Sequence, residues 1–474
     1  GGRSLAVEIV YDFESETKSF TNDGSPPAMT YDTPLFPGLS AVEGHEIHAR
    51  FDGGTLSSDG GVLVLRQIER RLMFADKLAS CLQDGRDPSR TAHSHASMIR
   101  ERIFAIACGY EDCDDLDDLR HDPALKIACE RLPESGRALA SQPTLSRLEN
   151  LPTWRQLARM GLTLINLYCD SFRSVPGHIV LDIDDTTDRT HGGQQLSLFN
   201  SHAGGYCFQP IHIYDAATQK PVCFLLRPGK RPSGVEGAMV LRHVIRRIRA
   251  NWPRVAITVR GDSHYGTPEV MALLEQRGCT YIFGLAGNAR LKAQAQPWCE
   301  DVAMRRLTGK RDKRRRFFQI QYGAGSWAVM RKVIARVEAT EKGTDVRYVV
   351  TNIPGRSKHL YEKVYCARAN MENLIKEHKL YTKSDRTSCH RWEGNQFRLF
   401  LHTGAYWLLL HLRQAAPRRS RWRGATFETL RRNFLKIAVR VEQLKTRIRI
   451  NWPTACPRQK LLVLLVTNMN AQSP

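Results

Sequence analysis

The stretch Ile179-Val180-Leu181-Asp182-Ile183-Asp184-Asp185 is the part of the sequence that most clearly predicts the fold. An apolar run that then alternates with acids is typical of a core strand ending at a polar edge. Because side chains alternate across a strand, Asp182 and Asp184 share one face, and Asp185 lies on the other unless the strand has already ended. Asp184 is our first choice for a metal ligand, Asp182 is a neighbour, and Asp185 remains an alternative.

The residues around this strand predict an α/β sheet. Strands are expected at 179–184, 206–214, 221–227, 255–260 and 280–285, with helices at 235–250 and 268–276. Three strands followed by alternating helix and strand is the order of a ribonuclease-H-like sheet. Residues from about 60 to 173 have helical periodicity instead, which predicts a helical region before the sheet.

A second acid follows a later predicted strand. Asp262 lies in Gly261-Asp262-Ser263-His264, directly after the strand expected at 255–260. Open α/β sheets place their functional sites where strands end, which favours a catalytic interpretation of Asp262. A residue in the turn that enters a helix is the alternative.

A third acid lies in a segment with helical spacing. At about 100° per residue, Tyr365, Arg368, Glu372 and Lys379 fall within an arc of roughly 60°. The adjacent arc is apolar and suits packing on a sheet. The segment therefore predicts a helix, from about 361 to 378, that presents a carboxylate flanked by cations.

Charge points to a polyanionic partner. The 474 residues include 70 Lys and Arg against 48 Asp and Glu, a net charge of +22. Such an excess favours binding to nucleic acid. No apolar run approaches the ~20 residues of a membrane helix, so no membrane partner is expected. The 12 cysteines form no Cys-x-x-Cys pair, which excludes zinc-finger spacing and predicts reduced thiols.

Composition also predicts the division of the chain. We expect a mobile arm over 1–40, a helical domain over 41–175, the first part of an α/β core over 176–290, a β-rich insertion over 291–345, the second part of the core over 346–415, and a basic region over 416–474. Within the insertion, β-type segments lie at 317–322, 327–331 and 333–337. The basic cluster 310–316 is either a DNA clamp or a solvated loop.

One motif resembles a known family. The segment from Tyr365 to Lys379 matches Tyr-x-x-Arg-x-x-x-Glu-x(6)-Lys, the signature of bacterial insertion-sequence transposases of the DDE class. Further stretches resemble one branch of that group: Leu181 to Thr186, Arg260 to Ser263, Arg386 to His390, and Asn395 to Leu399. The likeness covers most of the chain from about 50 to 415.

The resemblance implies both a fold and an activity. The fold is a ribonuclease-H-like catalytic core with a β-rich insertion, preceded by an α-helical N-terminal domain that binds terminal inverted repeats. The implied activity is metal-dependent cleavage of those repeats and strand transfer into target DNA. The partners would be double-stranded DNA and a second copy of the chain, in a homodimer on DNA, within the bacterial cytoplasm and nucleoid.

The same resemblance assigns site residues. Asp184, Asp262 and Glu372 would be catalytic and would bind two Mg²⁺ or Mn²⁺ ions. Tyr365, Arg368 and Lys379 would contact DNA near the cleaved phosphate. The run Asp184-Asp185-Thr186 allows either register for the first ligand, and strand parity favours Asp184.

Two other functions fit the same residues. A ribonuclease-H-fold nuclease would cut DNA without strand transfer. A catalytically decayed DNA-binding protein would keep the charge and lose the chemistry, although the presence of all three carboxylates argues against decay.

Overall fold

The computed structural model describes residues 39–49, 51–309 and 312–471. Most of the expected arm over 1–40 and the first two residues of the basic cluster, Lys310 and Arg311, lie outside these ranges. The chain divides into two units, Gly1–Gly54 and Thr55–Pro474. In the first unit Val42 and His45 form a two-residue bridge, with N–H···O distances of 3.0 and 2.9 Å. Over the ranges described, no helix has the length and apolar character needed to cross a membrane.

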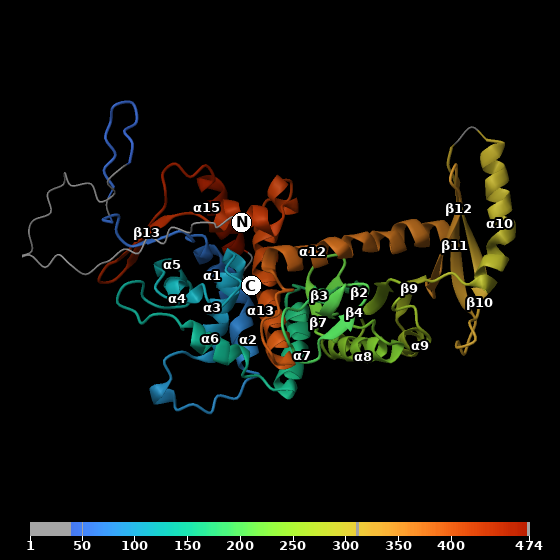
Figure 1. The fold of residues 1–474 in the computed structure, drawn as a ribbon, viewed down its shortest axis with the longest axis horizontal. Coiled ribbons are helices and arrows are strands. Elements are labelled where there is room, and N and C mark those ends of the chain that lie inside the picture. Colours follow the sequence, from blue (N-terminus) through green and yellow to red (C-terminus); the bar gives the residue numbers. More distant parts are fainter. Residues whose placement is uncertain (1–38, 50, 310–311, 472–474) are drawn as a thin grey trace, which may run out of the picture. The chain divides into compact units, whose positions relative to one another are not determined.

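A mixed eight-stranded sheet forms the centre of the larger unit. Its strand order is β10-β11-β12-β9-β8-β2-β6-β7 (Figure 1). The strands are β2 His178–Asp185, β6 Ile211–Asp215, β7 Pro221–Leu225, β8 Ala256–Gly261, β9 Thr280–Leu285, β10 Arg314–Tyr322, β11 Arg331–Thr340 and β12 Gly343–Thr351. β2 pairs antiparallel with β6 and parallel with β8, and β8 pairs parallel with β9. The predictions of strands near 179–184, 221–227, 255–260 and 280–285 are confirmed.

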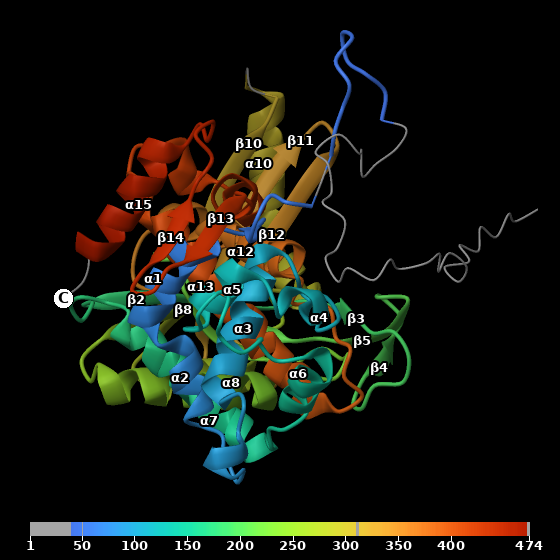
Figure 2. The same ribbon diagram turned by 90° about the vertical axis from the view of Figure 1, so that its left-hand side faces the viewer.

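The prediction of a single strand at 206–214 is wrong. Its first half is β5 (Gly205–Phe208), which belongs to a separate three-stranded sheet of order β3-β5-β4, and its second half is β6. Pro210 separates the two halves, and because proline has no backbone N–H, a hydrogen-bonded ladder does not run through it. The other strands of the small sheet are β3 Asp188–Arg189 and β4 Leu198–Asn200. Figure 2 shows this small sheet at the periphery of the ribbon, beyond α6.

Helices lie on both faces of the large sheet. α8 (Gly234–Asn251) and α9 (Pro268–Gln276) lie on one face and α12 (Asn370–Thr382) on the other (Figure 1). α8 begins at a capping box in which Ser233 and Glu236 exchange side-chain and backbone hydrogen bonds. The helices predicted at 235–250 and 268–276 are confirmed.

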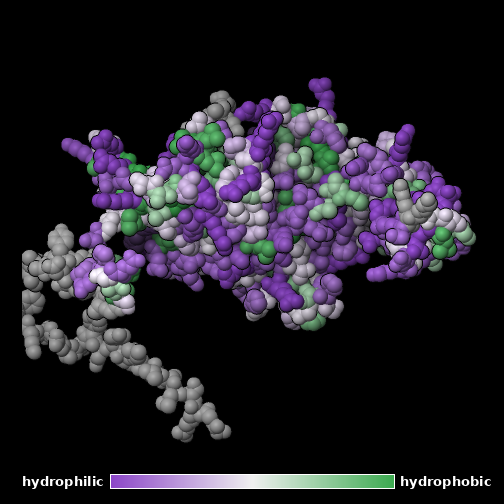
Figure 3. Space-filling view, turned by 90° about the horizontal axis from the view of Figure 1, so that it is seen from above, coloured by the Kyte–Doolittle hydropathy of each residue, from purple (hydrophilic) through white to green (hydrophobic). Residues whose placement is uncertain are grey.

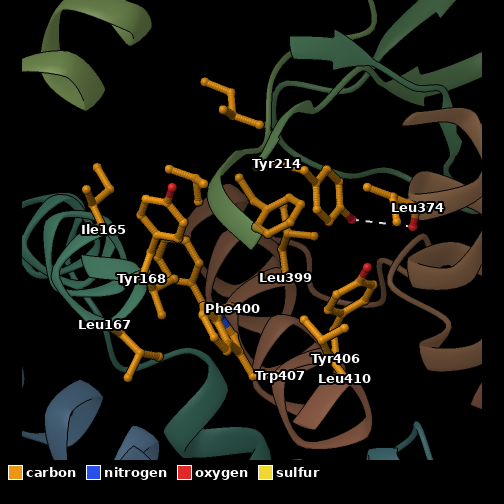
Figure 4. Packing of buried hydrophobic residues seen from close by; sticks show 14 of the residues in the cluster. Ile165, Leu167, Tyr168, Tyr214, Leu374, Leu399, Phe400, Tyr406, Trp407 and Leu410 are labelled. Carbon is orange, nitrogen blue, oxygen red and sulfur yellow. Dashed lines mark hydrogen bonds between the residues drawn. The ribbon is translucent and has the colours of Figure 1, made fainter. Parts of the chain in front are cut away.

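The N-terminal helices pack around the long buried helix α13 (Trp392–Ala415). They are α1 Val62–Leu72, α2 Phe74–Ala79, α3 His95–Cys108, α4 Leu116–Leu119, α5 Pro123–Ala128, α6 Gln142–Glu149 and α7 Trp154–Asp170, with a 3₁₀ turn at Pro88–Arg90. Figure 4 shows α13 side chains such as Phe400 and Trp407 beside Tyr168 of α7. In the same view the Tyr214 hydroxyl donates to the Leu374 carbonyl over 3.5 Å, which ties β6 to α12.

A buried ion network joins three of these helices. Glu149 accepts from Arg102 Nε over 3.0 Å and from Arg398 Nη1 over 2.8 Å. Burial opposes ionisation of Glu149, but Arg398 and Arg102 outweigh it and hold the pKa of the carboxyl below its ordinary value. Arg398 lies in the Asn395–Leu399 motif, which therefore has a structural role in anchoring α13 to α3 and α6.

The insertion differs from its expected β-rich form. It begins with the long helix α10 (Ala289–Leu307), whose buried residues are Leu291, Ala295 and Val302. The strand expected at 327–331 is a loop instead, in which Trp327 donates its N–H to the Ala324 carbonyl. Strand β12 then pairs antiparallel with β9 over four residue pairs, so the β10–β12 meander extends the large sheet.

The C-terminal region returns to the N-terminal helices. β13 (Val439–Gln443) pairs with β14 (Ile448–Asn451) and with β1 (Leu56–Ser57). The remaining elements are a 3₁₀ turn Arg421–Gly424, α14 Phe427–Leu430, a π-helical turn Arg431–Leu435 and α15 Gln459–Ala471. Hydrophilic residues cover most of the face in Figure 3, and apolar residues form small separate groups there.

Candidate functional site

Asp184 and Asp262 lie side by side at the ends of two parallel strands. Ile183 of β2 is in register with Gly261 of β8, so the acids that follow them occupy neighbouring positions. Paired strands are about 4.8 Å apart, which brings both carboxylates to one edge of the sheet. Their side chains are 13% and 29% exposed, so solvent reaches both.

Burial and neighbouring acids disfavour the ionised form of Asp184. Its pKa is raised to about 7, first by burial and then by Asp262 and Asp185, while Arg368 and a hydrogen bond from the Asp185 nitrogen lower it. Clustered carboxylates that resist ionisation in this way are suited to a hard divalent cation, which prefers oxygen ligands. The donor set of Asp184 and Asp262 therefore fits a Mg²⁺ or Mn²⁺ ion.

Asp185 is engaged by protein groups. Its Oδ1 lies 3.1 Å from His264 Nδ1 and accepts from the Tyr265 hydroxyl over 3.3 Å, while Oδ2 accepts from Gln209 Nε2 over 2.9 Å. The His264 Nδ1 is also 3.7 Å from Asp262 Oδ2. The hydrogen bond to Asp185 raises the pKa of His264 against the effect of burial, and the ring lies between the two acids.

Asp182 is engaged more completely. Arg260 donates to both of its carboxylate oxygens, over 2.6 and 2.7 Å, and donates its remaining terminal nitrogen to the Val364 carbonyl over 2.8 Å. Both side chains are buried, so Asp182 and Arg260 together anchor the segment that leads to Tyr365.

The segment from 357 to 382 is not one regular helix, and the assumption of 100° per residue throughout is wrong. It consists of α11 (Ser357–His359), a π-helical turn Leu360–Tyr365, a 3₁₀ turn Cys366–Ala369 and then α12. A π turn closes i→i+5 hydrogen bonds and a 3₁₀ turn closes i→i+3 bonds, so each changes the rotation per residue. Within α12, Glu372 and Lys379 are still about 20° apart and share a face.

Two cations of this segment contact the end of β2 and the residues after it. Arg368 Nη2 donates to Asp184 Oδ2 over 2.8 Å. Lys379 Nζ lies 3.0 Å from Asp188 Oδ1 and 3.3 Å from Thr186 Oγ1. Burial raises the pKa of Asp188 to about 6, and Lys379 opposes this shift. Arg368 and Lys379 therefore bracket the polar end of the first core strand.

Tyr365 lies at the end of β9, beside a glycine that sequence reasoning missed. A side chain at Gly284 would place its Cβ 2.9 Å from the Tyr365 hydroxyl and 2.9 Å from the Ser263 nitrogen. Only glycine allows this close approach, and a glycine within a predicted strand is the signal that could have identified it. Burial raises the pKa of Tyr365, so its hydroxyl is available as a neutral donor.

Glu372 is not brought to the other two acids. It lies in the first turn of α12 with an exposed side chain that forms no hydrogen bond or ion pair with any described residue. Among residues 39–49, 51–309 and 312–471, no group of three or more His, Cys, Asp or Glu side chains is arranged to hold a metal ion. The structure thus brings Asp184, Asp262, Tyr365 and Arg368 together. The Glu372 carboxylate projects from α12 into solvent instead.

A cleft of about 1210 Å³ adjoins Lys379. Its lining includes Gln142 from the N-terminal helices, Thr187 and Arg189 from the start of the small sheet, and Arg386 from the loop after α12. Arg386 forms ion pairs with acids of the N-terminal region, at 2.7 Å from Glu111 and 2.9 Å from Asp112. The only sequence signal for this cleft is the Arg386 to His390 motif.

Comparisons with known proteins agree with this arrangement at the level of family. A family model described as transposase DDE domain group 1 matches residues 39–474. No curated protein matches the chain. One similar solved structure is the cryo-EM structure of the piggyBac transposase synaptic complex with hairpin DNA, at 10% sequence identity and a TM-score of 0.44, covering 78% of this chain and 79% of that chain.

Proposed function

The chain belongs to the transposase DDE domain family, group 1, and we propose that it cuts DNA at the terminal inverted repeats of a bacterial insertion sequence and joins the ends to target DNA. The observation that carries this proposal is the adjacent pair Asp184 and Asp262, with Arg368 hydrogen-bonded to Asp184. Two adjacent acids, a neighbouring arginine and the high positive charge of the whole protein together suit the cleavage of a phosphodiester bond.

The strand order of the large sheet is consistent with a ribonuclease-H-like core, which is part of this proposal. Along the strands β7-β6-β2-β8-β9, the first three are antiparallel neighbours and the last two run parallel to β2. Numbered in chain order without the small sheet, the spatial order is 3-2-1-4-5. We propose that the helical region before the sheet binds DNA ends and that the segment after β9 is an insertion in this core.

Asp184 and Asp262 are the ligands that we assign to this core. They share the face of the sheet that carries α12, whereas Asp185 turns to His264, Tyr265 and Gln209. Glu372 is the third proposed ligand, because it lies on the α12 face between the contacts of Arg368 and Lys379.

Each residue then has a defined task. Mg²⁺ or Mn²⁺ bound at these carboxylates would activate a water or a 3′-hydroxyl and stabilise the leaving oxygen. Arg368, released from Asp184, would hold the scissile phosphate through a two-pronged contact. Tyr365 would donate its hydroxyl to the same phosphate group, and Lys379 would contact the DNA next to it.

The rest of the chain would hold the DNA. A net charge of +22 predicts many phosphate contacts and therefore strongly salt-dependent binding. The helices α1 to α7 would read the terminal repeats, and a homodimer on the DNA would hold two ends together. The bacterial cytoplasm is the compartment in which this activity fits.

A cleavage and joining assay tests the proposal. DNA carrying the element's own flanking ends would be incubated with Mg²⁺ or Mn²⁺ and with wild type, Asp184→Ala, Asp262→Ala or Glu372→Ala. Metal-dependent nicking and joining by wild type, absent from all three variants, is expected. Nicking without joining of a pre-cut end would favour the nuclease, and binding without nicking would favour the decayed DNA-binding protein.

A further inference from the structure

The small sheet presents a bare pair of aromatic rings. Phe199 of β4 is in register with Tyr206 of β5, and their ring centroids are 5.8 Å apart at an interplanar angle of 76°. The two residues are 63% and 59% exposed. Exposed aromatic neighbours on a strand pair mark an interaction surface, because no packing requires them there.

The opposite face of the small sheet is covered. A Cβ at Gly229 would be 2.6 Å from Cys207 Sγ and 2.9 Å from the Leu198 carbonyl, so the loop after β7 packs closely on that face. The side chain of Asn200 also donates to the Gly229 carbonyl over 2.9 Å. The rings are therefore held on a supported platform.

The covering loop leads from the platform to the acids. It continues from Gly229 into Lys230 and Arg231, which are both exposed. Arg231 Nη2 donates to the Ser263 carbonyl over 3.2 Å, and Ser263 directly follows Asp262. A basic loop thus connects the aromatic platform with the proposed catalytic edge.

The platform also borders Lys379. Asp188, which forms an ion pair with Lys379, is in register with Phe208 of β5. Phe208 follows Tyr206 by two residues, so Tyr206 lies about 7 Å along the strand from that ion pair. Alternation of side chains places Tyr206, Phe208 and Asp188 on one face of the small sheet.

We infer that Phe199 and Tyr206 form a stacking platform for unpaired DNA bases next to the cut phosphate, an inference that rests on the proposed function. Bases stack on exposed aromatic rings when a cationic groove holds the backbone, and Lys230, Arg231 and Lys379 supply the cations here. Paired bases inside a duplex have no free face, so the ligand is a single-stranded tail or a frayed end.

The test uses the full chain without divalent metal, so that nothing is cut. Two fluorescein-labelled probes share one sequence: a blunt duplex, and a duplex with a 3′ tail of six nucleotides containing 2-aminopurine. We expect Phe199→Ala and Tyr206→Ala to weaken binding of the tailed probe by about 5- to 150-fold, the range for loss of one stacked base, and to leave blunt-duplex binding unchanged. Tyr206→Phe keeps the ring and should retain wild-type binding.

Controls keep the outcomes separate. Met304→Ala removes a comparably exposed apolar side chain (61%) from α10, to which the proposed function assigns no DNA contact, and should leave the tailed probe bound as in wild type. Quenching of 2-aminopurine by wild type, reduced in Phe199→Ala, supports stacking. Wild-type affinity and quenching in both alanine variants would overturn the inference, as would equal losses on both probes. Failure of wild type to bind either probe would instead overturn the proposed function and the inference with it.

Discussion

Arg260 of β8 donates two hydrogen bonds from its guanidinium to the Asp182 carboxylate of the neighbouring strand β2, over 2.6 and 2.7 Å. The side chains are 7% and 2% exposed, so the pair is shielded from water. The third contact of Arg260, with the Val364 carbonyl, ties these strands to the residue before Tyr365. One buried side chain therefore sets the position of the segment that brings Tyr365 and Arg368 to the acidic edge.

Arg260→Ala should lower the free energy of unfolding by about 3–5 kcal/mol, because it leaves the buried Asp182 without its partner. Urea denaturation measures this loss, and cleavage should fall with it at a temperature where the variant is still folded. Arg260→Lys keeps the charge and loses the two-pronged geometry, so its stability should be intermediate. Unchanged stability in Arg260→Lys would contradict the role of the paired contacts.

Glu372→Ala should abolish cleavage and change the free energy of unfolding by no more than about 0.5 kcal/mol, because the carboxylate is exposed and unpaired. Binding of end DNA should persist. The matched control is Glu377→Ala on the same helix, which removes an ion pair with Arg413 at 2.6 Å and should cost stability without loss of cleavage. Residual metal-dependent joining in Glu372→Ala would remove Glu372 from the site.

Mg²⁺ should stabilise wild type and not Asp184→Asn. A ligand that binds only the folded state at 100 times its Kd adds about 2.7 kcal/mol to the free energy of unfolding, which appears as a rise in Tm. Asp170→Asn, at an exposed carboxylate of α7 (56%), is the control and should respond as wild type does. An equal rise in Asp184→Asn would show that the ion binds elsewhere.

Glu101 makes stability depend on pH. Burial raises the pKa of its carboxyl to about 8, and the hydrogen bond from the Ala140 nitrogen only partly opposes this. From about pH 4.5 to pH 8 the folded chain holds a proton that the unfolded chain releases. Stability therefore falls as pH rises, by up to about 1.4 kcal/mol per pH unit.

Glu101→Gln should remove that dependence, so its stability relative to wild type should increase from pH 5 to pH 8. The change at Glu149 has the opposite sign, because Arg398 and Arg102 lower the pKa of Glu149 and keep it ionised. Glu149→Gln should therefore destabilise the chain by a nearly constant amount from pH 5 to pH 8, and by less below about pH 4.5. Denaturation of both variants at the two pH values checks the pair, and a constant difference for Glu101→Gln would refute the assignment.

Local pattern was sufficient to predict most of the large sheet. Apolar strand-like runs marked β2, β7, β8 and β9, because each of these signals lies within the element that it predicts. The break at Pro210 was visible in the sequence and was overlooked. Helix α10 was missed because only Leu291, Ala295 and Val302 are buried, too few to give a continuous apolar stripe.

The site was less predictable because its contacts are not local. Strand parity placed Asp182 and Asp184 on one face, but only the register of β2 against β8 reveals that Arg260 neutralises Asp182. The π-helical turn before Tyr365 has no short sequence signature, so the predicted arc misplaced Tyr365 and Arg368 relative to Glu372. The small sheet was not predicted because its strands, of only two to four residues, are too short to give a clear pattern in the sequence.

The hydrogen bond between Arg368 and Asp184 spans 184 residues of chain. A ribosome adds about 5–20 residues each second, so Asp184 is synthesised on the order of 10–40 s before its partner. During that interval Asp184 has no Arg368 beside it, and a chain released before residue 368 cannot form this contact. The Arg368 side of the candidate site therefore forms only late in synthesis, after the strand that carries Asp184 is already complete.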